Sequence, residues 1–473
     1  MTNRKSWLAA MLCVAALSGC GGSDSSVDSA DGDAAEVVAT ADATVLGEGT
    51  PSAVAPVAEA ASGTSVDTIE SDDERAHALA VPAPNAATAI GYGRQVTGGA
   101  GSGAERVRVT NTTDLVKALC NKVVGGKCTD DTRRIIEVAT TINFIGTEKS
   151  LPAMACNYSS CSSPWKPERL VLMNPNETHC KERKLPTFQI SYDKAGAESM
   201  LVGSNKTLIG LGSTGVIKGK GLMLASGVSN VIIRNLTFSD INPGIIFAGD
   251  AIRLGNTDRV WIDHNRFARI GRQMLVTGWQ GGAASNVTVS WNEFDGRSEY
   301  PNMCDGKHYW NVLLAGKGDS MTFASNWIHD FSGRGPDIHG SNQIVHFVNN
   351  YFQDGSNYAV DPGATSTVLM EGNYFKTVKQ PILKNSSHGY VFAPLAPMSS
   401  ATTSQCNAAL KRNCVPNVAD PMPQTNNFSL DAAVLNALKS APSGAVASPY
   451  GVSKVPQLVP KQAGPGHLGS SSS

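Results

Sequence analysis

The residues best suited to chemistry lie in one segment, residues 230–294. They are Asp250, Asp263, His264, Arg269 and Arg272. Glycoside hydrolysis uses a close pair of carboxylates, whereas Asp250 and Asp263 are expected on separate turns of a repeating backbone. Calcium needs several hard oxygen ligands, and no acid lies between Asp263 and Glu293. The arginines instead offer a fixed, planar set of N–H donors, which suits the stabilisation of negative charge on carboxyl oxygens.

A short β-rich run recurs through this segment and beyond it, at residues 231–238, 260–267, 287–294, 321–328, 344–352 and 367–375. Five runs carry an asparagine two residues before the closing Phe or Ile: Asn265, Asn292, Asn326, Asn350 and Asn373. Such recurrence is typical of a solenoid, and asparagines at one fixed place can stack, each amide bonding the next. We therefore predict an all-β fold, a right-handed parallel β-helix. An antiparallel sandwich would also space strands evenly, but it gives no reason for the repeated asparagine.

Five ordered motifs carry a family resemblance: GDAI (249–252), VWIDHN (260–265), IGRQ (270–273), CDGKHYW (304–310) and SGRGP (332–336). Together they resemble polysaccharide lyase family 1, the pectate and pectin lyases, and within it the fungal-type pectin lyases. The similarity runs from about Gly91 to about His467. It implies cleavage of α-1,4-linked galacturonan by β-elimination. In that reaction a base removes the proton at carbon 5, negative charge builds on the carboxyl group, and a 4,5 double bond forms.

The resemblance also assigns catalytic roles to three residues. Arg334 in SGRGP matches the family's catalytic arginine, although arginine normally stays protonated and is an awkward base. Arg272 is the neighbouring positive charge that would lower the proton affinity of Arg334. It would also place its guanidinium where pectate lyases hold calcium. Asp250 is expected to orient Arg272.

Other residues are expected to line the groove or to support it. His308, Tyr309 and Trp310 match an aromatic patch that receives ester methyl groups and sugar faces. Phe247 is the nearest aromatic residue at a place where the pectin lyase pattern commonly has Trp. Asp337 stands where that pattern has Lys, three residues after Arg334, and this lost cation puts the ester preference in doubt. Asp263 and His264 are expected to be structural.

The leading reading is a pectin lyase that needs no cofactor and acts on methyl-esterified galacturonan. A calcium-dependent pectate lyase acting on polygalacturonate is the first alternative, which a basic domain favours mildly. A polygalacturonase-like hydrolase would need clustered carboxylates. A non-catalytic pectin-binding β-helix at the cell surface is disfavoured because both Arg272 and Arg334 are present.

The two ends of the chain differ in composition from the middle. Residues 1–20 have a basic start and an apolar stretch, typical of an export signal. They end in Leu17-Ser-Gly-Cys20, which resembles a bacterial lipobox with Cys20 as the lipidated residue. Residues 21–85 hold thirteen acids and one Arg, and low hydrophobicity with such a charge predicts a disordered tether. Since the whole chain is −1 and the signal contributes two positive charges, the remaining domain, residues 86–473, carries a net +9.

A basic exported domain suits a polyanionic partner such as galacturonan, and no nucleic-acid motif is present. We expect a monomer that is secreted, or held at the surface or outer membrane of a bacterium through the lipid anchor alone. A short helix starting at Thr112 or Thr113 is expected to cap the open end of the β-helix. Residues 394–448, with a helix at 430–438, are expected to pack back on the solenoid.

Eight cysteines follow the tether, and an even number in an exported chain indicates disulfides. Eight cysteines allow 105 pairings, so spacing alone does not choose between them. No pair of cysteines and histidines has the spacing of a zinc site, and no metal is expected. The resemblance to pectin lyases implies Cys156–Cys180, Cys161–Cys304 and Cys406–Cys414, which leaves Cys120–Cys128.

Overall fold

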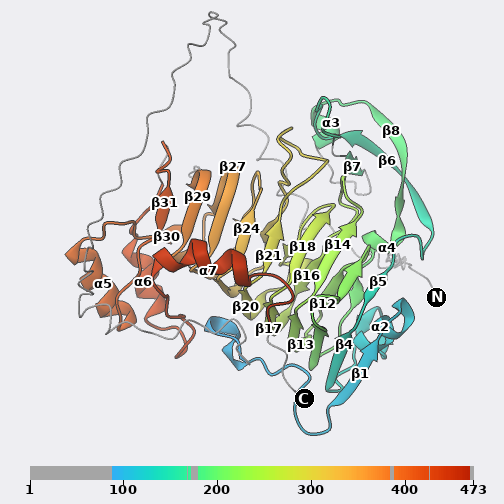
Figure 1. The fold of residues 1–473 in the computed structure, drawn as a ribbon, viewed down its shortest axis with the longest axis horizontal. Helices are drawn as coiled ribbons and strands as arrows, with labels where there is room; N and C mark the ends of the chain where they lie inside the picture. Colours follow the sequence, from blue (N-terminus) through green and yellow to red (C-terminus); the bar gives the residue numbers. More distant parts are fainter. Residues whose placement is uncertain (1–87, 168, 172–178, 384–387, 425–426, 469–473) are drawn as a thin grey trace, which may run out of the picture.

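The computed structural model describes residues 88–473 apart from residues 168, 172–178, 384–387, 425–426 and 469–473. The expected signal, Cys20 and the acidic tether lie outside these residues. Within them, parallel strands form three long sheets that the chain visits in turn, so the backbone is a parallel β-helix (Figure 1). The predicted fold class is confirmed. No helix in the described part is long and apolar enough to span a membrane.

We call the three sheets sheet 1, sheet 2 and sheet 3, in the order in which each coil enters them. Sheet 1 contains β1 (Glu105–Val109), β4 (Arg134–Val138), β10 (Lys206–Gly210), β13 (Ser229–Arg234), β17 (Thr257–Asp263), β20 (Ala284–Ser290), β23 (Ser320–Ala324), β26 (Ile344–Val348), β28 (Thr367–Glu371) and β30 (Tyr390–Phe392). Sheet 2 contains β5 (Thr141–Asn143), β11 (Val216–Lys218), β14 (Thr237–Ile241), β18 (Arg266–Ile270), β21 (Glu293–Asp295), β24 (Trp327–His329), the start of β27 (Tyr351–Pro362), β29 (Tyr374–Ile382) and β31 (Val418–Asp420). Sheet 3 contains β9 (Met200–Leu201), β12 (Leu222–Ala225), β16 (Ile252–Gly255), β19 (Leu275–Val276), β22 (Val312–Leu314), β25 (Asp337–Ile338) and the end of β27.

Each repeated run of the sequence spans two strands and the corner between sheets 1 and 2. In the run at 231–238 the corner residue is Asn235, with φ of 59° between β13 and β14. The equivalent corners at His264, Trp291 and Ser325 have φ of 52°, 53° and 54°. Left-handed backbone costs a non-glycine residue about 1–2 kcal/mol. The contacts between neighbouring coils must therefore outweigh this cost at every turn.

The asparagine ladder directly follows these corners. Each side-chain amide donates to the side-chain oxygen of the next asparagine, from Asn265 to Asn292 (3.0 Å), Asn326 (3.0 Å), Asn350 (2.9 Å) and Asn373 (2.9 Å). All five asparagines are buried. The predicted ladder is confirmed, and it continues one step further to Asn417 at 2.9 Å.

The closing residues of the runs form the core that the ladder encloses. Phe238, Phe267 and Phe294 are register partners with stacked rings, whose centroids lie 5.6 and 5.1 Å apart. Phe352 and Phe375 continue the column at 4.8 Å. Large rings stacked at the spacing of the strands bury apolar area on every coil. The closing position of the repeat therefore contributes a column of aromatic rings to an interior that is otherwise mostly Val, Ile and Leu.

A helix closes the N-terminal end and begins at Thr112, one of the two predicted starts, but its N-cap is the residue before it. α2 spans Thr112–Leu119, and its N-cap is Asn111, whose side chain accepts from the backbone N–H of Asp114 at 2.9 Å. Thr112 and Thr113 lie inside the helix, because the Asn111 side chain already satisfies the orphan N–H of Asp114. Leu115 and Leu119 are buried against the first coils.

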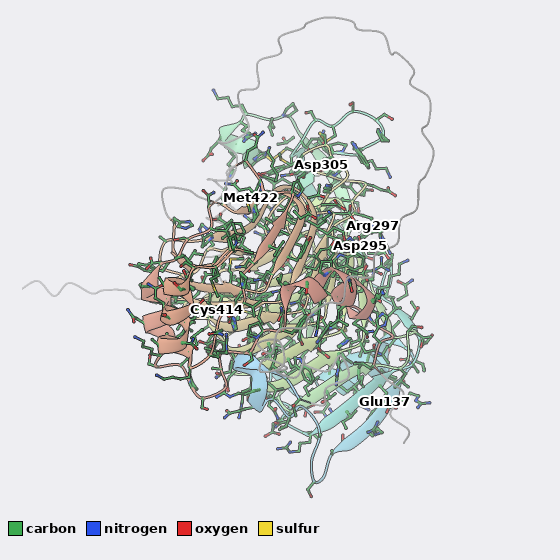
Figure 2. All side chains as sticks on the ribbon, turned by 60° about the vertical axis from the view of Figure 1, so that its left-hand side comes forward. Glu137, Asp295, Arg297, Asp305, Cys414 and Met422 are labelled. Atoms are coloured by element: carbon green, nitrogen blue, oxygen red, sulfur yellow. A yellow bond between two sulfur atoms is a disulfide. The ribbon has the colours of Figure 1, made fainter. Side chains whose placement is uncertain are left out.

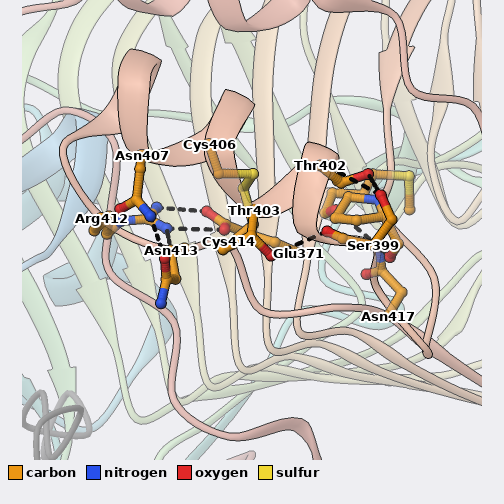
Figure 3. Close-up of a disulfide and its surroundings, with 12 residues drawn as sticks. Glu371, Ser399, Thr402, Thr403, Cys406, Asn407, Arg412, Asn413, Cys414 and Asn417 are labelled. Atoms are coloured by element: carbon orange, nitrogen blue, oxygen red, sulfur yellow. Dashed lines mark hydrogen bonds and ion pairs between the residues drawn. A yellow bond between two sulfur atoms is a disulfide. The ribbon is translucent and has the colours of Figure 1, made fainter. Parts of the chain in front are cut away.

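Two helices, α5 (Ser400–Leu410) and α6 (Ala432–Leu438), cover the other end, and the Cys406–Cys414 disulfide lies between α5 and the solenoid (Figure 3). Next to it, Arg412 donates to both oxygens of Glu371, at 2.9 and 2.5 Å, and His346 Nε2 contacts the same carboxylate at 3.0 Å. Burial alone would raise the pKa of Glu371, but the charge and hydrogen bonds of Arg412 and His346 outweigh it and hold that pKa at about 2. The predicted helix at 430–438 is present, whereas α5 and α7 (Val455–Gln462) were not predicted.

Residues 89–99, including the 3-10 helix η3 (Gly91–Gln95), form a strap across the outer face of sheet 1. Its backbone N–H groups donate to side chains on four strands of sheet 1, namely β23, β20, β13 and β10. Tyr92 donates to Thr322 (3.1 Å), Gly93 to Thr288 (2.9 Å), Gly98 to Asn230 (2.9 Å) and Gly99 to Thr207 (2.9 Å). An added Cβ at Gly91 would lie 2.2 Å from the Thr322 hydroxyl oxygen. The strap therefore needs glycine there to lie this close to the sheet.

A large excursion leaves the solenoid between β5 and β9. β6 (Ser150–Asn157), β7 (Arg169–Val171) and β8 (Thr187–Asp193) join β15 (Ile245–Ile246) in a small sheet at the upper right of Figure 1. The remaining short elements are the hairpin β2 (Val123–Val124) and β3 (Lys127–Cys128), with α3 (His179–Glu182), α4 (Lys194–Ala197), η4 (Trp279–Gly281) and η5 (Val452–Lys454). Four disulfides form, Cys120–Cys128, Cys156–Cys180, Cys161–Cys304 and Cys406–Cys414, which are the pairs given by the resemblance and by exclusion.

The disulfides should differ in their effect on stability. Cys161–Cys304 closes a separation of 143 residues and Cys406–Cys414 one of 8. Loop-closure entropy gives about 5 and about 2.5 kcal/mol respectively. We expect replacement of Cys161 and Cys304 by Ser to lower the midpoint of thermal unfolding more than replacement of Cys406 and Cys414. Equal shifts in the two double variants would contradict this ranking.

Candidate active site

The candidate residues meet at the corner between sheets 2 and 3. Asp250, Arg272, Trp310 and Arg334 stand shortly before β16, β19, β22 and β25, which are consecutive strands of sheet 3. Register pairs Ile252 with Leu275 and Leu275 with Val312, so these turns lie one above the other. With about 4.8 Å between neighbouring strands, the turns of Arg272 and Arg334 are about 10 Å apart. Extended arginine side chains can act on one ligand across that separation.

Arg272 is fixed by the coil beneath it. Its backbone N–H donates to the carbonyl oxygen of Gly249 at 2.9 Å, and its guanidinium carbon lies 4.4 Å from the ring centroid of Phe247. Phe247 is half-buried, with φ of 67°. Its ring therefore supports the guanidinium through a cation–π contact. Substrate binding by Phe247 stays a prediction.

Asp250 helps to fix the turn that carries Arg272, through hydrogen bonds to two neighbouring residues. One carboxylate oxygen accepts from Arg253 Nε at 2.8 Å, and the other accepts from the backbone N–H of Gln273 at 2.9 Å. Asp250 is buried, with 2% of its surface exposed. Its contact with Gln273, the residue after Arg272, fixes the turn that carries the guanidinium.

His308 is not placed as the expected groove residue. Its Nε2 contacts the carbonyl oxygens of Arg272 at 2.7 Å and of Trp310 at 2.9 Å. Both partners are acceptors, so Nε2 carries a proton and donates to them. The ring is buried, with 4% exposure. This side chain ties together the turns that precede β19 and β22, and substrate binding by His308 stays a prediction.

Tyr309 and Trp310 are also buried, at 5% and 2% exposure. The Tyr309 hydroxyl lies 2.9 Å from that of Tyr358, and the Trp310 ring meets Tyr158 of the excursion edge-on at 5.0 Å. Both rings are enclosed in this structure, and contact with a sugar stays a prediction. The excursion packs over them, and this long-range packing is not visible in the local motif.

Arg334 stands at the next turn, with φ of 45°. Its backbone carbonyl accepts from the N–H of Val312 at 2.8 Å, and its guanidinium carbon lies 5.6 Å from the Tyr309 ring centroid. Its Nε lies 3.3 Å from an oxygen of Asp337, the residue that replaces the expected Lys. Arg334 is 1% and Arg272 4% exposed.

Asp263 and His264 lie away from this corner, at the boundary of sheets 1 and 2. Asp263 accepts from Ser290 Oγ at 2.6 Å and from His264 Nδ1 at 2.7 Å, and pairs with Arg234 Nε at 2.7 Å. The contacts with Ser290 and Arg234 join neighbouring coils of the solenoid. The geometry agrees with the structural role expected for the pair.

Sequence reasoning missed one cluster of possible metal ligands, Glu293, Asp295 and His329 on sheet 2. Arg297 donates to both oxygens of Asp295, at 2.8 and 2.6 Å, and the two residues are labelled close together in Figure 2. Arg266 also donates to Asp295, at 2.6 Å. Burial alone would raise the pKa of Asp295, but the hydrogen bonds from Arg297 and Arg266 outweigh it and hold this pKa well below its usual range. Both oxygens of Asp295 already accept hydrogen bonds from arginine guanidinium groups. The cluster is therefore better described as an ion-pair network than as a metal site. Only the register of β21 and β24 could have revealed it.

Comparison with known proteins adds an independent observation. A family model described as "Pectate lyase" matches residues 179–431, more than half of the chain. A probable pectin lyase A of Aspergillus clavatus is 39% identical over 384 residues, which cover 80% of this chain and 94% of that protein. The chain belongs to the pectate lyase family.

Two further proteins are similar to this chain. A probable pectin lyase F-2 of Aspergillus terreus is 43% identical over 295 residues, which cover 61% of this chain and 58% of the relative. A solved structure of a pectate lyase bound to a hexasaccharide aligns with 82% of this chain and all of its own at 18% identity, with a TM-score of 0.49.

The resemblance to pectate lyases implies a calcium ion at such a site. The residues present here are poorly suited to bind one. Calcium takes six to eight oxygen ligands. Here Arg253 and the Gln273 backbone engage both oxygens of Asp250, and Arg334 pairs with Asp337. Arg272 adds a fixed positive charge in the same corner, which would repel a divalent cation.

Proposed function

We propose that the protein is a pectin lyase, which cleaves α-1,4-linked galacturonan methyl ester by β-elimination, without calcium, to 4,5-unsaturated oligosaccharides. The similarity to probable fungal pectin lyases supports the substrate class. The observation that carries the calcium independence is Arg272, a buried guanidinium fixed by Gly249 and Phe247 on the turn beside Asp250.

In the proposed reaction Arg334 takes the proton from carbon 5 of a galacturonate ester. The electron pair forms the double bond between carbons 4 and 5, the glycosidic oxygen at carbon 4 leaves, and water supplies its proton. Charge that develops on the ester carbonyl during this step is stabilised by the guanidinium of Arg272, which is already in place. Arg272 also makes a second positive charge nearby less favourable, which lowers the affinity of Arg334 for its extra proton.

The test is the initial rate of formation of unsaturated uronides from high-ester pectin and from polygalacturonate, each with and without a chelator. We expect turnover of high-ester pectin to survive the chelator. If the chelator abolishes turnover and added calcium restores it, the protein is a calcium-dependent pectate lyase. If neither polymer yields unsaturated products, the β-helix is a binding protein.

His308 should support catalysis indirectly, by holding the turn of Arg272. We expect His308→Ala to lower kcat about ten- to a hundredfold with little change in KM, because two buried carbonyl oxygens lose their donor. His308→Gln should recover much of the rate, since its amide nitrogen can reach the position of Nε2, whereas His308→Asn is too short. Steady-state kinetics of the three variants, with unfolding midpoints, would check this. Equal rates for the Gln and Asn variants would contradict it.

Four disulfides support export of the protein. We propose in addition that Cys20 is lipidated after signal cleavage. The relatives reported above are fungal, so this anchor rests on the Leu17-Ser-Gly-Cys20 sequence alone. Cys20→Ser should move the protein from the membrane fraction to the soluble fraction. An unchanged distribution would overturn the anchor.

A further inference from the structure

Two carboxylates stand side by side next to Arg334. Asp337 on β25 is the register partner of Asp361 on β27, and the following pair, Ile338 and Pro362, is buried. Ile338 belongs to the core of the solenoid. Because side chains alternate along a strand, Asp337 and Asp361 project from the outer face of sheet 3. The spacing of neighbouring strands places their Cα atoms about 4.8 Å apart.

Asp337 links this acidic pair to the proposed base. Its Oδ2 lies 3.3 Å from Arg334 Nε, and its Oδ1 lies 3.8 Å from Nδ1 of the half-exposed His339. Both carboxylates also act on the buried Tyr358 next to Tyr309. Burial raises the pKa of Tyr358 first, and the charges of Asp337 and Asp361 raise it further. The two acids therefore lie within electrostatic reach of the candidate reaction site.

The charges around the corner cancel. Three guanidinium groups face three carboxylates: Arg253, Arg272 and Arg334 against Asp250, Asp337 and Asp361. The residues between the charged ends of the same outer column are apolar. Val276 and Leu313 occupy the rungs between Arg253 and Asp337, and with Ala315 they form a small apolar cluster. A site for a polyanion would show surplus positive charge, which this column lacks.

We propose that Asp337, with Asp361 beside it, determines specificity by disfavouring free galacturonate carboxylates next to Arg334. A free uronate brings one negative charge to this pair, whereas the methyl ester brings none. Repulsion between like charges at a largely buried site is screened weakly by salt. The inference rests on the proposed pectin lyase function and assigns its ester preference to two residues of this chain.

The test compares the ratio of kcat/KM on low-ester pectin to that on high-ester pectin, with chelator throughout. We expect Asp337→Asn to raise this ratio about tenfold. Asp361→Asn should shift it in the same direction while leaving the Arg334–Asp337 pair intact. The matched control is Asp258→Asn, which makes the same charge change on sheet 1 at a side chain that is 42% exposed, and should leave the ratio as in the wild type.

The outcomes separate this inference from the function on which it depends. A wild-type protein that is inert on every pectin refutes the pectin lyase function. An active wild type whose ratio stays unchanged in Asp337→Asn and in Asp361→Asn refutes the specificity role alone. A fall in kcat by the same factor on both substrates would make Asp337 a positioning residue for Arg334 and would likewise overturn the proposal.

Discussion

Arg272→Ala is expected to lose about a hundred- to a thousandfold in rate on high-ester pectin while the fold persists. Loss of a single preorganised donor to developing negative charge costs about 3–4 kcal/mol. The side chain packs on the Phe247 ring and not in the core of the solenoid, so its removal leaves the sheets intact. The measurement is the initial rate in chelator, with the unfolding midpoint as a check on folding.

Two further variants make this prediction specific to the guanidinium group. Arg272→Lys should recover little activity, because a point charge cannot reproduce the planar set of donors. Arg269→Ala is the matched control from the same segment. Arg269 is about half exposed and pairs with Asp240 on the outside of sheet 2, so its loss should leave the rate within about twofold. Comparable losses in the Arg269 and Arg272 variants would point to a general charge effect.

Arg334→Lys is expected to lower kcat about a hundred- to ten-thousandfold, the range of a misplaced acid–base group. The lysine keeps the charge and the pairing with Asp337, but its single nitrogen lies elsewhere than the guanidinium nitrogens. KM should change much less than kcat, because ground-state contacts along the polymer remain. Arg334→Ala should be slower still, and added free guanidine should restore part of its rate.

The matched control for this position is Arg297→Ala, which removes a 63% exposed arginine from the ion-pair network with Asp295. It should leave kcat on pectin within about twofold. Retention of more than a tenth of the wild-type kcat by Arg334→Lys would show that Arg334 is not the base. The Asp337 carboxylate beside it would then be the next candidate.

The repeating part of the molecule could be predicted from the sequence because each coil repeats the same local rule. The asparagine recurs at one place in five of the six runs and the closing phenylalanine in five of the six, and the structure stacks both. Asn417 escaped prediction because Ala419 stands where the closing aromatic would be. The cap of α2 was misassigned because Asn111, Thr112 and Thr113 are all plausible N-caps, and only the backbone geometry chooses between them.

The candidate site was predictable only in part, for a physical reason. Arg272 and Arg334 are 62 positions apart, and their alignment in one corner follows from the coil spacing. The burial of His308 and Trp310 depends instead on an excursion more than a hundred residues earlier in the chain. The pairing of Asp337 with Asp361 depends on a register that no local pattern carries. The catalytic and binding roles of these residues stay predictions.

The strap of residues 89–99 determines the orientation of the folded domain when it is attached through its N-terminal end. It runs across sheet 1 and emerges near Thr322 and the C-terminal half of the solenoid, whereas Arg272 and Arg334 lie at the corner between the other two sheets. A group attached directly before residue 88 is therefore joined to the molecule on the side of sheet 1. Fixed to a bead, a vesicle or a cell wall through this end, the enzyme would turn its arginines toward the solution, where long polymers can reach them.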